Sequence, residues 1–143
     1  MLFRSASVPL DGDDSEVSEL AAMHAKLFGA SDEERDAAAS IAIKLLAHPR
    51  IGDARAAEQA GRRVWRETPV SVRLNSPSDP VPHIVDGQVD LAYETERGWV
   101  VVDFKTDIEI ASAQDAYKQQ VALYVEAVKR ATGQPATGVL LRV

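Results

Sequence analysis

The sequence predicts an α/β fold, in which helices cover a central β-sheet. Two apolar runs, Val89–Tyr93 and Trp99–Phe104, flank the short polar segment 94–98, a pattern typical of a β-hairpin. The second run begins with consecutive apolar residues that do not alternate with polar ones, as expected for a strand covered on both faces. Apolar residues recur every three or four positions in 15–28 and form a broad face in 112–132, which predicts helices that pack on this sheet.

The chain has 143 residues, a length that favours one domain with its own core. Residues 1–14 lack periodicity, so we expect a flexible leader there and a single domain over 15–143. No apolar stretch approaches the roughly 20 residues that span a bilayer, and the N-terminus lacks the apolar segment of a signal peptide. We therefore expect a cytoplasmic protein that does not enter a membrane.

The composition excludes several classes of site. Without cysteine, the chain cannot form disulfides, thiolate zinc sites or cysteine-ligated iron–sulfur clusters. It contains no P-loop motif, so we expect no ATP to be bound by this chain. The net charge of −6 argues against a domain that holds a nucleic-acid backbone by electrostatics alone. If the substrate is DNA, part of the grip must come from elsewhere.

The remaining elements follow from start and stop signals. Ser15 is the expected N-cap of the first helix and Gly29 ends it; a capping box from Ser31 to Glu34 opens the second. The second helix is expected to end near His48, as a solvated C-terminal residue before a proline. Further elements are expected in chain order: a short helix within 52–61, strands 64–67 and 70–74 with Pro69 at a kink or edge, an exposed loop 75–82 followed by a surface His83, a helix 112–132 ended by Gly133, and a buried strand 137–143.

Charged residues interrupt the buried strand at its end. Asp103 and Lys105 are two positions apart and therefore project to the same face of that strand. Asp90 lies on the neighbouring arm of the hairpin, where a plausible register brings it to the same corner. Gly87, three residues earlier, permits a tight approach or a bulge. Because buried ionised groups are costly unless they are paired or bind a metal, this cluster needs a reason.

One reason is catalysis. Two carboxylates suit Mg²⁺ or Mn²⁺, which prefer oxygen ligands and retain several waters. A nearby lysine can orient or deprotonate an attacking water, or stabilise the negative charge that develops at phosphorus. Asp90, Asp103 and Lys105 together are the parts of a metal-dependent phosphodiesterase.

Other candidate residues each have two interpretations. His24 lies on the apolar face of the first helix and is either a histidine of the core or a metal ligand. Tyr117, Gln120 and Tyr124 are spaced along one face of the last helix, as a packed rim or as a surface that contacts the substrate. Glu67 is either a solvated carboxylate on an edge strand or a further acid of the site.

These residues, in this order, resemble the RecB-family nucleases of the PD-(D/E)XK superfamily, especially the C-terminal nuclease domain of bacterial AddA-type (UvrD-like) helicase–nucleases. The resemblance extends from about residue 17 to 143. It rests on His24, Gly87-Gln88-Val89-Asp90-Leu91, Val102-Asp103-Phe104-Lys105-Thr106-Asp107 and Gln120-x-x-x-Tyr124. One departure is Ala21-Ala22-Met23, where the family has Gly-Thr just before the histidine.

The resemblance implies a restriction-endonuclease-like fold, a central mixed sheet flanked by helices, and cleavage of DNA phosphodiester bonds with Mg²⁺ or Mn²⁺. It implies that Asp90, Asp103 and the Phe104 carbonyl bind the metal and that Lys105 is catalytic. It also implies that His24 is a ligand, which would favour Mn²⁺, and that Gln120 and Tyr124, beside Tyr117, position the substrate. Single-stranded DNA ends are the implied substrate. The implied partners, in DNA repair and recombination, are helicase motor domains or a partner subunit.

Two alternatives remain from the sequence. The domain keeps the nuclease fold without catalysis and serves DNA binding or docking in a complex, or it is a metal-free α/β scaffold in which Asp103 and Lys105 form an ion pair. Thermal stability that Mn²⁺ does not change would support the metal-free scaffold, because a ligand that binds only the native state must stabilise it.

Overall fold

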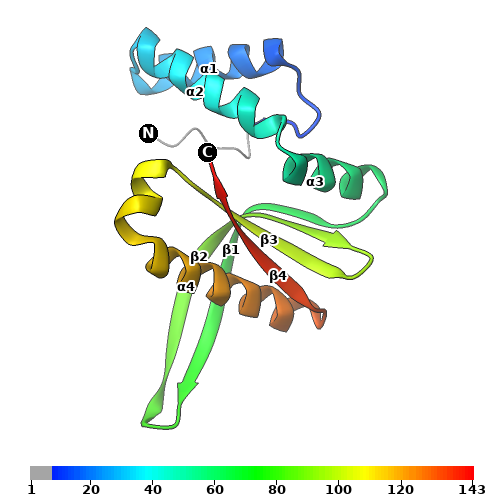
Figure 1. The fold of residues 1–143 in the computed structure, drawn as a ribbon, viewed down its shortest axis with the longest axis vertical. Coiled ribbons are helices and arrows are strands. Elements are labelled where there is room, and N and C mark those ends of the chain that lie inside the picture. Colours follow the sequence, from blue (N-terminus) through cyan, green and yellow to red (C-terminus); the bar gives the residue numbers. More distant parts are fainter. Residues whose placement is uncertain (1–7) are drawn as a thin grey trace. The chain divides into compact units, whose positions relative to one another are not determined.

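The computed structural model describes residues 8–143, apart from the side chains of residues 107 and 108. The chain forms two compact units, Met1–Gly61 together with Val143, and Arg62–Arg142. The first unit is helical and the second contains the β-sheet (Figure 1). The single domain predicted for residues 15–143 stays a prediction, since two compact units can belong to one domain. No helix in the described part of the chain is long and apolar enough to cross a membrane.

The helical unit consists of α1 (Asp14–Phe28), α2 (Asp32–Leu46) and α3 (Pro49–Gln59). The capping box of α2 is confirmed, because the Ser31 hydroxyl accepts from the Glu34 N–H and the Glu34 carboxylate accepts from the Ser31 N–H. A small core joins Val8, Val17 and Ala42. The first two helices therefore pack through one apolar stripe each, as their periodicity predicts.

The predicted N-cap of α1 and the predicted role of His48 are wrong, although α2 does end near His48, at Leu46. The N-cap of α1 is Asp13, whose carboxylate accepts from the N–H groups of Ser15 and Glu16, so Ser15 is inside the first turn. His48 does not simply end α2: its Nδ1 accepts from the Arg50 N–H, and it is the N-cap of α3. The physical reason is Pro49, whose fixed φ suits the first position of a helix.

Part of the predicted leader lies outside the described residues, which begin at Val8. From there the chain is packed, because Val8 and Leu10 are buried and the Leu10 carbonyl accepts a 2.7 Å hydrogen bond from Arg55 Nε. The helical unit thus begins before residue 15, at which the sequence placed its start.

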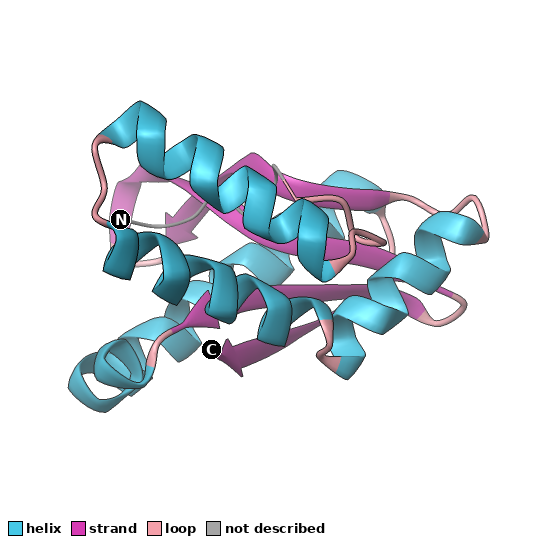
Figure 2. Ribbon diagram, turned by 90° about the horizontal axis from the view of Figure 1, so that it is seen from above, coloured by secondary structure: helices cyan, strands magenta, loops and turns pink. Residues whose placement is uncertain are grey.

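The sheet unit contains β1 (Val64–Ser76), β2 (Asp79–Thr95), β3 (Gly98–Lys105), α4 (Asp107–Thr132) and β4 (Ala136–Arg142). The strand order is β1-β2-β3-β4; the first three are antiparallel and β4 is parallel to β3, so the sheet is mixed. Helix α4 crosses from β3 to β4 and packs on one face of the sheet (Figures 1 and 2). The predicted α/β fold, with its β2–β3 hairpin, is confirmed.

The core between α4 and the sheet is apolar. Its buried members are Val89, Ala92, Trp99, Val101, Tyr124, Val128 and Ala136. Val101 and Val102 are both fully buried, which confirms that β3 is covered on both faces. Since β3 is the strand that carries Asp103 and Lys105, these charged residues extend directly from the best-buried part of the sheet.

Residues 75–82 are largely exposed, as predicted, but most of them lie in strands and not in a loop. Strands β1 and β2 stay paired as far as Ser76 and Asp79, and together they form a long arm that extends beyond α4 (Figure 1). The prolines that suggested a loop, Pro80 and Pro82, are tolerated because a two-stranded arm has an open edge on each side, where an N–H is not needed. Pro69 likewise lies in β1, an edge strand as predicted.

Helix α4 begins earlier than the sequence predicted. Thr106 is its N-cap, and residues after it are helical up to a kink at Ala113, where φ is −155° and ψ is 38°. The helix predicted for 112–132 therefore corresponds mainly to the part of α4 that follows this kink. Gly133 ends the helix in a left-handed conformation, as predicted.

Candidate active site

The two acids of the site meet where β2 and β3 stop pairing. The last pair of this ladder is Leu91 with Val102. Beyond it, Oδ2 of Asp90 accepts a 2.8 Å hydrogen bond from the backbone N–H of Phe104. The side chain thus replaces the strand's backbone as acceptor and fixes the Asp90 carboxylate beside the end of β3.

Asp103 and Lys105 form an ion pair at the end of β3. Nζ of Lys105 lies 3.0 Å from Oδ2 of Asp103, with side-chain exposures of 14% and 2% respectively. The same Oδ2 atom is buried and makes no hydrogen bond of good geometry, so its charge is balanced by Lys105 but its lone pairs are not satisfied. Buried polar atoms in this state are rare and call for an explanation, such as an ion.

The surroundings shift two ionisation equilibria. Burial raises the pKa of Asp90 to about 6, and the nearby charge of Asp103 raises it too, while the Phe104 N–H acts in the opposite direction. Burial alone would lower the pKa of Lys105, but its close contact with Asp103 and the charges of Asp103 and Asp90 outweigh this, so the pKa is raised. Lys105 is therefore a cation at neutral pH.

Helix α4 contributes side chains to the same region. The Tyr117 ring lies under the Lys105 ammonium, with Nζ 4.9 Å from the ring centroid. Nε2 of Gln120 donates a 2.7 Å hydrogen bond to the hydroxyl of Tyr124. The Tyr124 ring in turn covers Gly87 so closely that a Cβ there would lie 2.5 Å from its Cε1 atom. The tight approach predicted at Gly87 is therefore present, and its partner is Tyr124.

The structure brings together Asp90, Asp103, Lys105 and Tyr117 within the sheet unit. His24 lies in the helical unit, on α1, where its half-buried ring stacks on Phe28 with centroids 6.0 Å apart. Its role as a metal ligand stays a prediction, as does that of the Phe104 carbonyl. His83 is exposed, as predicted, and its Nε2 lies 2.8 Å from Asp79.

Comparison with known proteins identifies the family of this chain. Residues 2–143 match the PD-(D/E)XK nuclease superfamily. This chain belongs to that superfamily. Over 85 residues it is also 31% identical to a protein of Alkaliphilus oremlandii (strain OhILAs) that is named as a subunit of an ATP-dependent helicase/nuclease. This match covers 51% of the chain but 7% of that relative, so the chain corresponds to a small part of it. The resemblance expected from the sequence, including the restriction-endonuclease-like fold, is confirmed.

Members of the PD-(D/E)XK superfamily generally use divalent metal ions, and the residues present fit such an ion. Asp90 and Asp103 supply hard oxygen donors, and the unsatisfied Oδ2 of Asp103 is a free ligand position. Among the described residues, no group of three or more His, Asp or Glu side chains is arranged to hold a metal. Two carboxylates are nevertheless sufficient for Mg²⁺, which commonly keeps several waters.

One residue near the site was not identified from the sequence. Glu109, in the first turn of α4, accepts hydrogen bonds of 2.7 Å and 2.9 Å from the N–H and hydroxyl of Thr106, and its charge helps to raise the pKa of Lys105. The signal was present as a capping box, Thr106-x-x-Glu109, directly after Lys105. Glu109 thus fixes the start of α4 beside Lys105.

Proposed function

We propose that this PD-(D/E)XK domain hydrolyses phosphodiester bonds of DNA with Mg²⁺ or Mn²⁺. The observation that carries the proposal is the buried Asp103, whose Oδ2 atom lies 3.0 Å from Lys105 Nζ and otherwise lacks a hydrogen bond. Asp90, from the neighbouring strand, adds a second carboxylate. A metal-free scaffold gains little from two acids in one buried corner, because each ionised group resists burial.

Asp90 and Asp103 would hold the ion, because their carboxylates are hard oxygen donors. The resemblance to the family adds the Phe104 carbonyl and His24 as further proposed ligands. A bound divalent ion supplies Lewis-acid neutralisation of charge on the scissile phosphate. The presence of an imidazole among the ligands favours Mn²⁺ over Mg²⁺.

Lys105 has a catalytic role. We propose that it orients or deprotonates the attacking water and offsets negative charge at phosphorus. Without a metal the pKa of Lys105 is raised and the group is an ammonium, whereas a divalent cation bound beside it would lower that pKa by repulsion between like charges. Tyr117, Gln120 and Tyr124 position the substrate strand and the site from α4.

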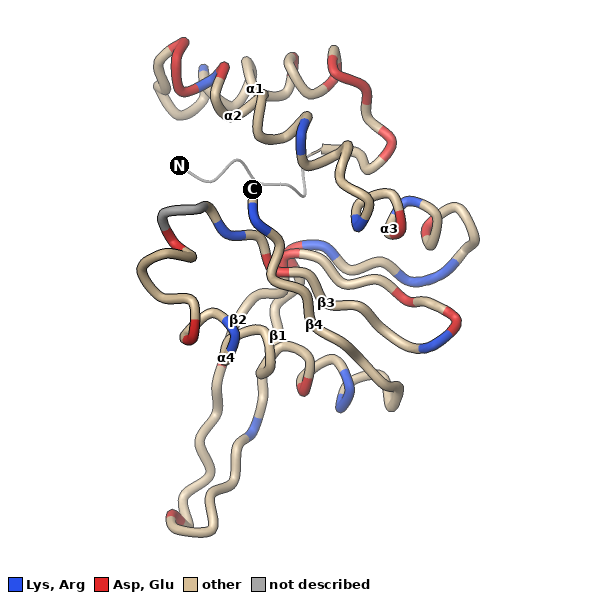
Figure 3. The backbone as a smooth tube through the Cα atoms, viewed as in Figure 1, with Lys and Arg blue, Asp and Glu red and all other residues tan. Residues whose placement is uncertain are grey.

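We infer that the domain works with other components in DNA repair or recombination. The chain has a net charge of −6, and acidic and basic residues are interspersed along its backbone (Figure 3). Such a surface holds DNA weakly, so helicase motor domains or a partner subunit would deliver single-stranded ends to it. The relative that is named as part of an ATP-dependent helicase/nuclease supports this arrangement.

The test is cleavage of end-labelled, linear single-stranded DNA with Mg²⁺, with Mn²⁺ and with a chelator. We expect metal-dependent products from the parent and a loss of at least about 100-fold in Lys105→Ala. Lys44→Ala, which changes an exposed lysine on α2, is the matched control and should cleave at the parental rate. Parental cleavage by Lys105→Ala would refute the assignment of Lys105. If the parent neither cleaves DNA nor binds Mn²⁺ in calorimetry, one of the two non-catalytic alternatives, the inactive nuclease fold or the metal-free scaffold, is correct.

A further inference from the structure

The outer edge of β4 is open. Within residues 8–143, β4 pairs with β3 alone, in parallel register from Ala136 to Arg142. In a strand paired on one side, every other residue directs its N–H and C=O groups away from the partner. Such an edge can accept a further strand, and proteins usually cover or blunt it.

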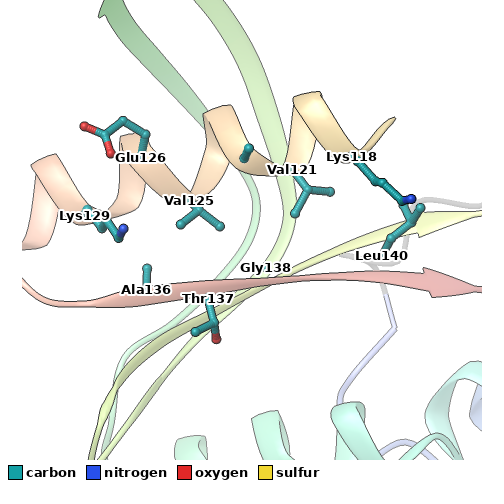
Figure 4. A pocket seen from close by; sticks show the side chains of 10 residues that line it. Lys118, Val121, Val125, Glu126, Lys129, Ala136, Thr137, Gly138 and Leu140 are labelled. Carbon is teal, nitrogen blue, oxygen red and sulfur yellow. The ribbon is translucent and has the colours of Figure 1, made fainter. Parts of the chain in front are cut away.

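A groove runs between this edge and α4. Its volume is ≈ 530 Å³, and all of its residues belong to the sheet unit. The helix side presents Val121 and Val125, and the strand side presents Ala136, Thr137, Gly138 and Leu140 (Figure 4). Gly138 allows this close packing, because a Cβ there would lie 2.4 Å from Cγ1 of Val121. The middle of the groove is therefore lined mainly by small apolar side chains and is bordered by open backbone groups.

Both ends of the groove carry a positive charge. Lys118 and Lys129 extend from α4 toward β4, whereas Glu126 is directed away from it (Figure 4). Glu126 is already paired, since its Oε1 accepts a 2.7 Å hydrogen bond from Arg130 Nε. The contact of Lys118 with Asp115 is long, 3.9 Å, and solvent-exposed, so it holds the lysine weakly. The groove thus favours negatively charged groups at both ends.

The spacing of the two lysines suits a short strand. Lys129 is eleven positions after Lys118, and a rise of about 1.5 Å per helical residue places their Cα atoms roughly 16 Å apart along α4. The first and fifth residues of a strand lie about 13 Å apart, at about 3.3 Å per residue, and the long lysine side chains cover the difference. The first, third and fifth side chains of such a strand project to one face. If that face is turned to α4, the outer two meet the lysines and the central one meets Val125.

We propose that the β4 edge and this groove bind an extended segment of a partner protein, which adds a strand to the sheet. The segment has carboxylates at its first and fifth positions and a small apolar side chain at its third. Backbone hydrogen bonds to β4 provide affinity, and the two lysines provide selectivity. Neither acid of the site nor Lys105 lines the groove, although Leu140 at its end pairs with Asp103 in the ladder. The proposal therefore does not depend on nuclease activity.

The test uses the full 143-residue chain and the synthetic peptide acetyl-Glu-Thr-Val-Thr-Glu-amide, followed by amide NMR shifts. We expect saturable shifts at Ala136–Leu140 and a loss of binding for the peptide with lysine at both ends. Reversal of both charges, Lys118→Glu with Lys129→Glu, should weaken binding at least about tenfold. The matched control, Lys26→Glu with Lys44→Glu, changes the net charge equally on exposed residues of the helical unit and should bind as the parent does.

Several outcomes would overturn the proposal. Equal binding of the peptide with lysine at both ends, or NMR shifts outside β4 and α4, would show that the groove does not select the peptide by charge. Binding by no peptide would mean that the lysines only protect the edge from aggregation. If sedimentation and hydrogen exchange show that the chain dimerises through 136–140, the groove binds a second copy of the chain. If oligothymidylate displaces the peptide, the groove binds a nucleic acid. Thermal unfolding of both variants checks that they fold.

Discussion

The backbone N–H of Phe104 donates a 2.8 Å hydrogen bond to Oδ2 of Asp90, and this bond joins the two strands of the site after their ladder has ended. It fixes the carboxylate of Asp90, on β2, beside the end of β3, where Asp103 lies. The two bonded residues are fourteen positions apart in the sequence. The bond also ties the position of Asp90 to the backbone of β3, so the two acids are held as one rigid unit. A metal site needs this kind of preorganisation.

Metal binding should stabilise the parent and not Asp103→Asn. The substitution keeps the size of the side chain but removes the charge of the buried Oδ2 that lacks a hydrogen bond. At a Mn²⁺ concentration of 100 times Kd, we expect the parent to gain about 2.7 kcal/mol in the free energy of unfolding. Denaturant unfolding with Mn²⁺ and with a chelator measures this gain.

The variant Asp115→Asn is the control, because Asp115 is an exposed acid of the sheet unit and lies outside the site. It should gain as much stability from Mn²⁺ as the parent. An equal gain in Asp103→Asn would show that the ion binds elsewhere, and no gain in the parent would favour the metal-free scaffold.

The stability of the metal-free protein should decrease as Asp90 ionises. Its pKa is raised from 3.8 in the unfolded chain to about 6, so its contribution to stability is present below the lower value and is lost as the pH rises through the higher one. Asp90→Asn stays neutral and can still accept from the Phe104 N–H. With partial exposure discounted, we expect it to exceed the parent by about 1–2 kcal/mol above pH of about 7.

Unfolding by denaturant in the presence of chelator, at about pH 4 and about pH 7.5, tests the sign of this effect. The two proteins should differ at the higher pH and agree at the lower one, because Asp90 is then protonated. Asp11→Asn, on an exposed residue, should follow the parent at both. If Asp90→Asn is less stable than the parent at the higher pH, the charged form of Asp90 is the one that the fold favours.

The sequence predicted the fold where local patterns were strong. The unbroken apolar run of β3 and the capping box at Ser31 predicted their elements correctly. It failed where long-range pairing overrode local preference: Pro80 and Pro82 suggested a loop, but antiparallel pairing with β1 extends β2 through them. His48 was misplaced because a proline ends one helix and starts the next by the same fixed φ.

For the site, the two-residue period of a strand was enough to pair Asp103 with Lys105. The sequence also suggested that Asp90 reaches them, but the bond that fixes it depends on where the β2–β3 ladder ends, which no local pattern encodes. The cation–π contact of Tyr117 with Lys105 depends on the path of α4 over the sheet. Such a path is a property of tertiary packing.

Gly87 should be intolerant of a side chain. In Gly87→Ala the new Cβ would lie 2.5 Å from Cε1 and 2.9 Å from the hydroxyl of Tyr124, so α4 or the ring must move. We expect a loss of about 1–3 kcal/mol in the free energy of unfolding. In a Tyr124→Ala background the same substitution should cost little, because the ring is absent.

The matched control for Gly87 is Gly52→Ala. Gly52 lies in α3, and a Cβ added there would meet no atom within 4 Å outside its own stretch of helix. Alanine at this position should therefore raise stability by up to about 1 kcal/mol through helix propensity. A cost at Gly87 that is equal in both Tyr124 backgrounds would show that backbone conformation, not the ring, requires glycine.

Tyr117 should matter through its ring, because the ring faces the Lys105 ammonium with Nζ 4.9 Å from its centroid. Tyr117→Phe keeps this face and should cleave DNA within about threefold of the parent, whereas Tyr117→Leu removes about 1 kcal/mol of cation–π attraction and should lower kcat about fivefold to tenfold. If Tyr117 instead contacts the substrate through its hydroxyl, Tyr117→Phe raises KM and leaves kcat unchanged. Equal kcat values for the two variants would show that Tyr117 does not act through Lys105. Steady-state kinetics on single-stranded DNA distinguishes these three results.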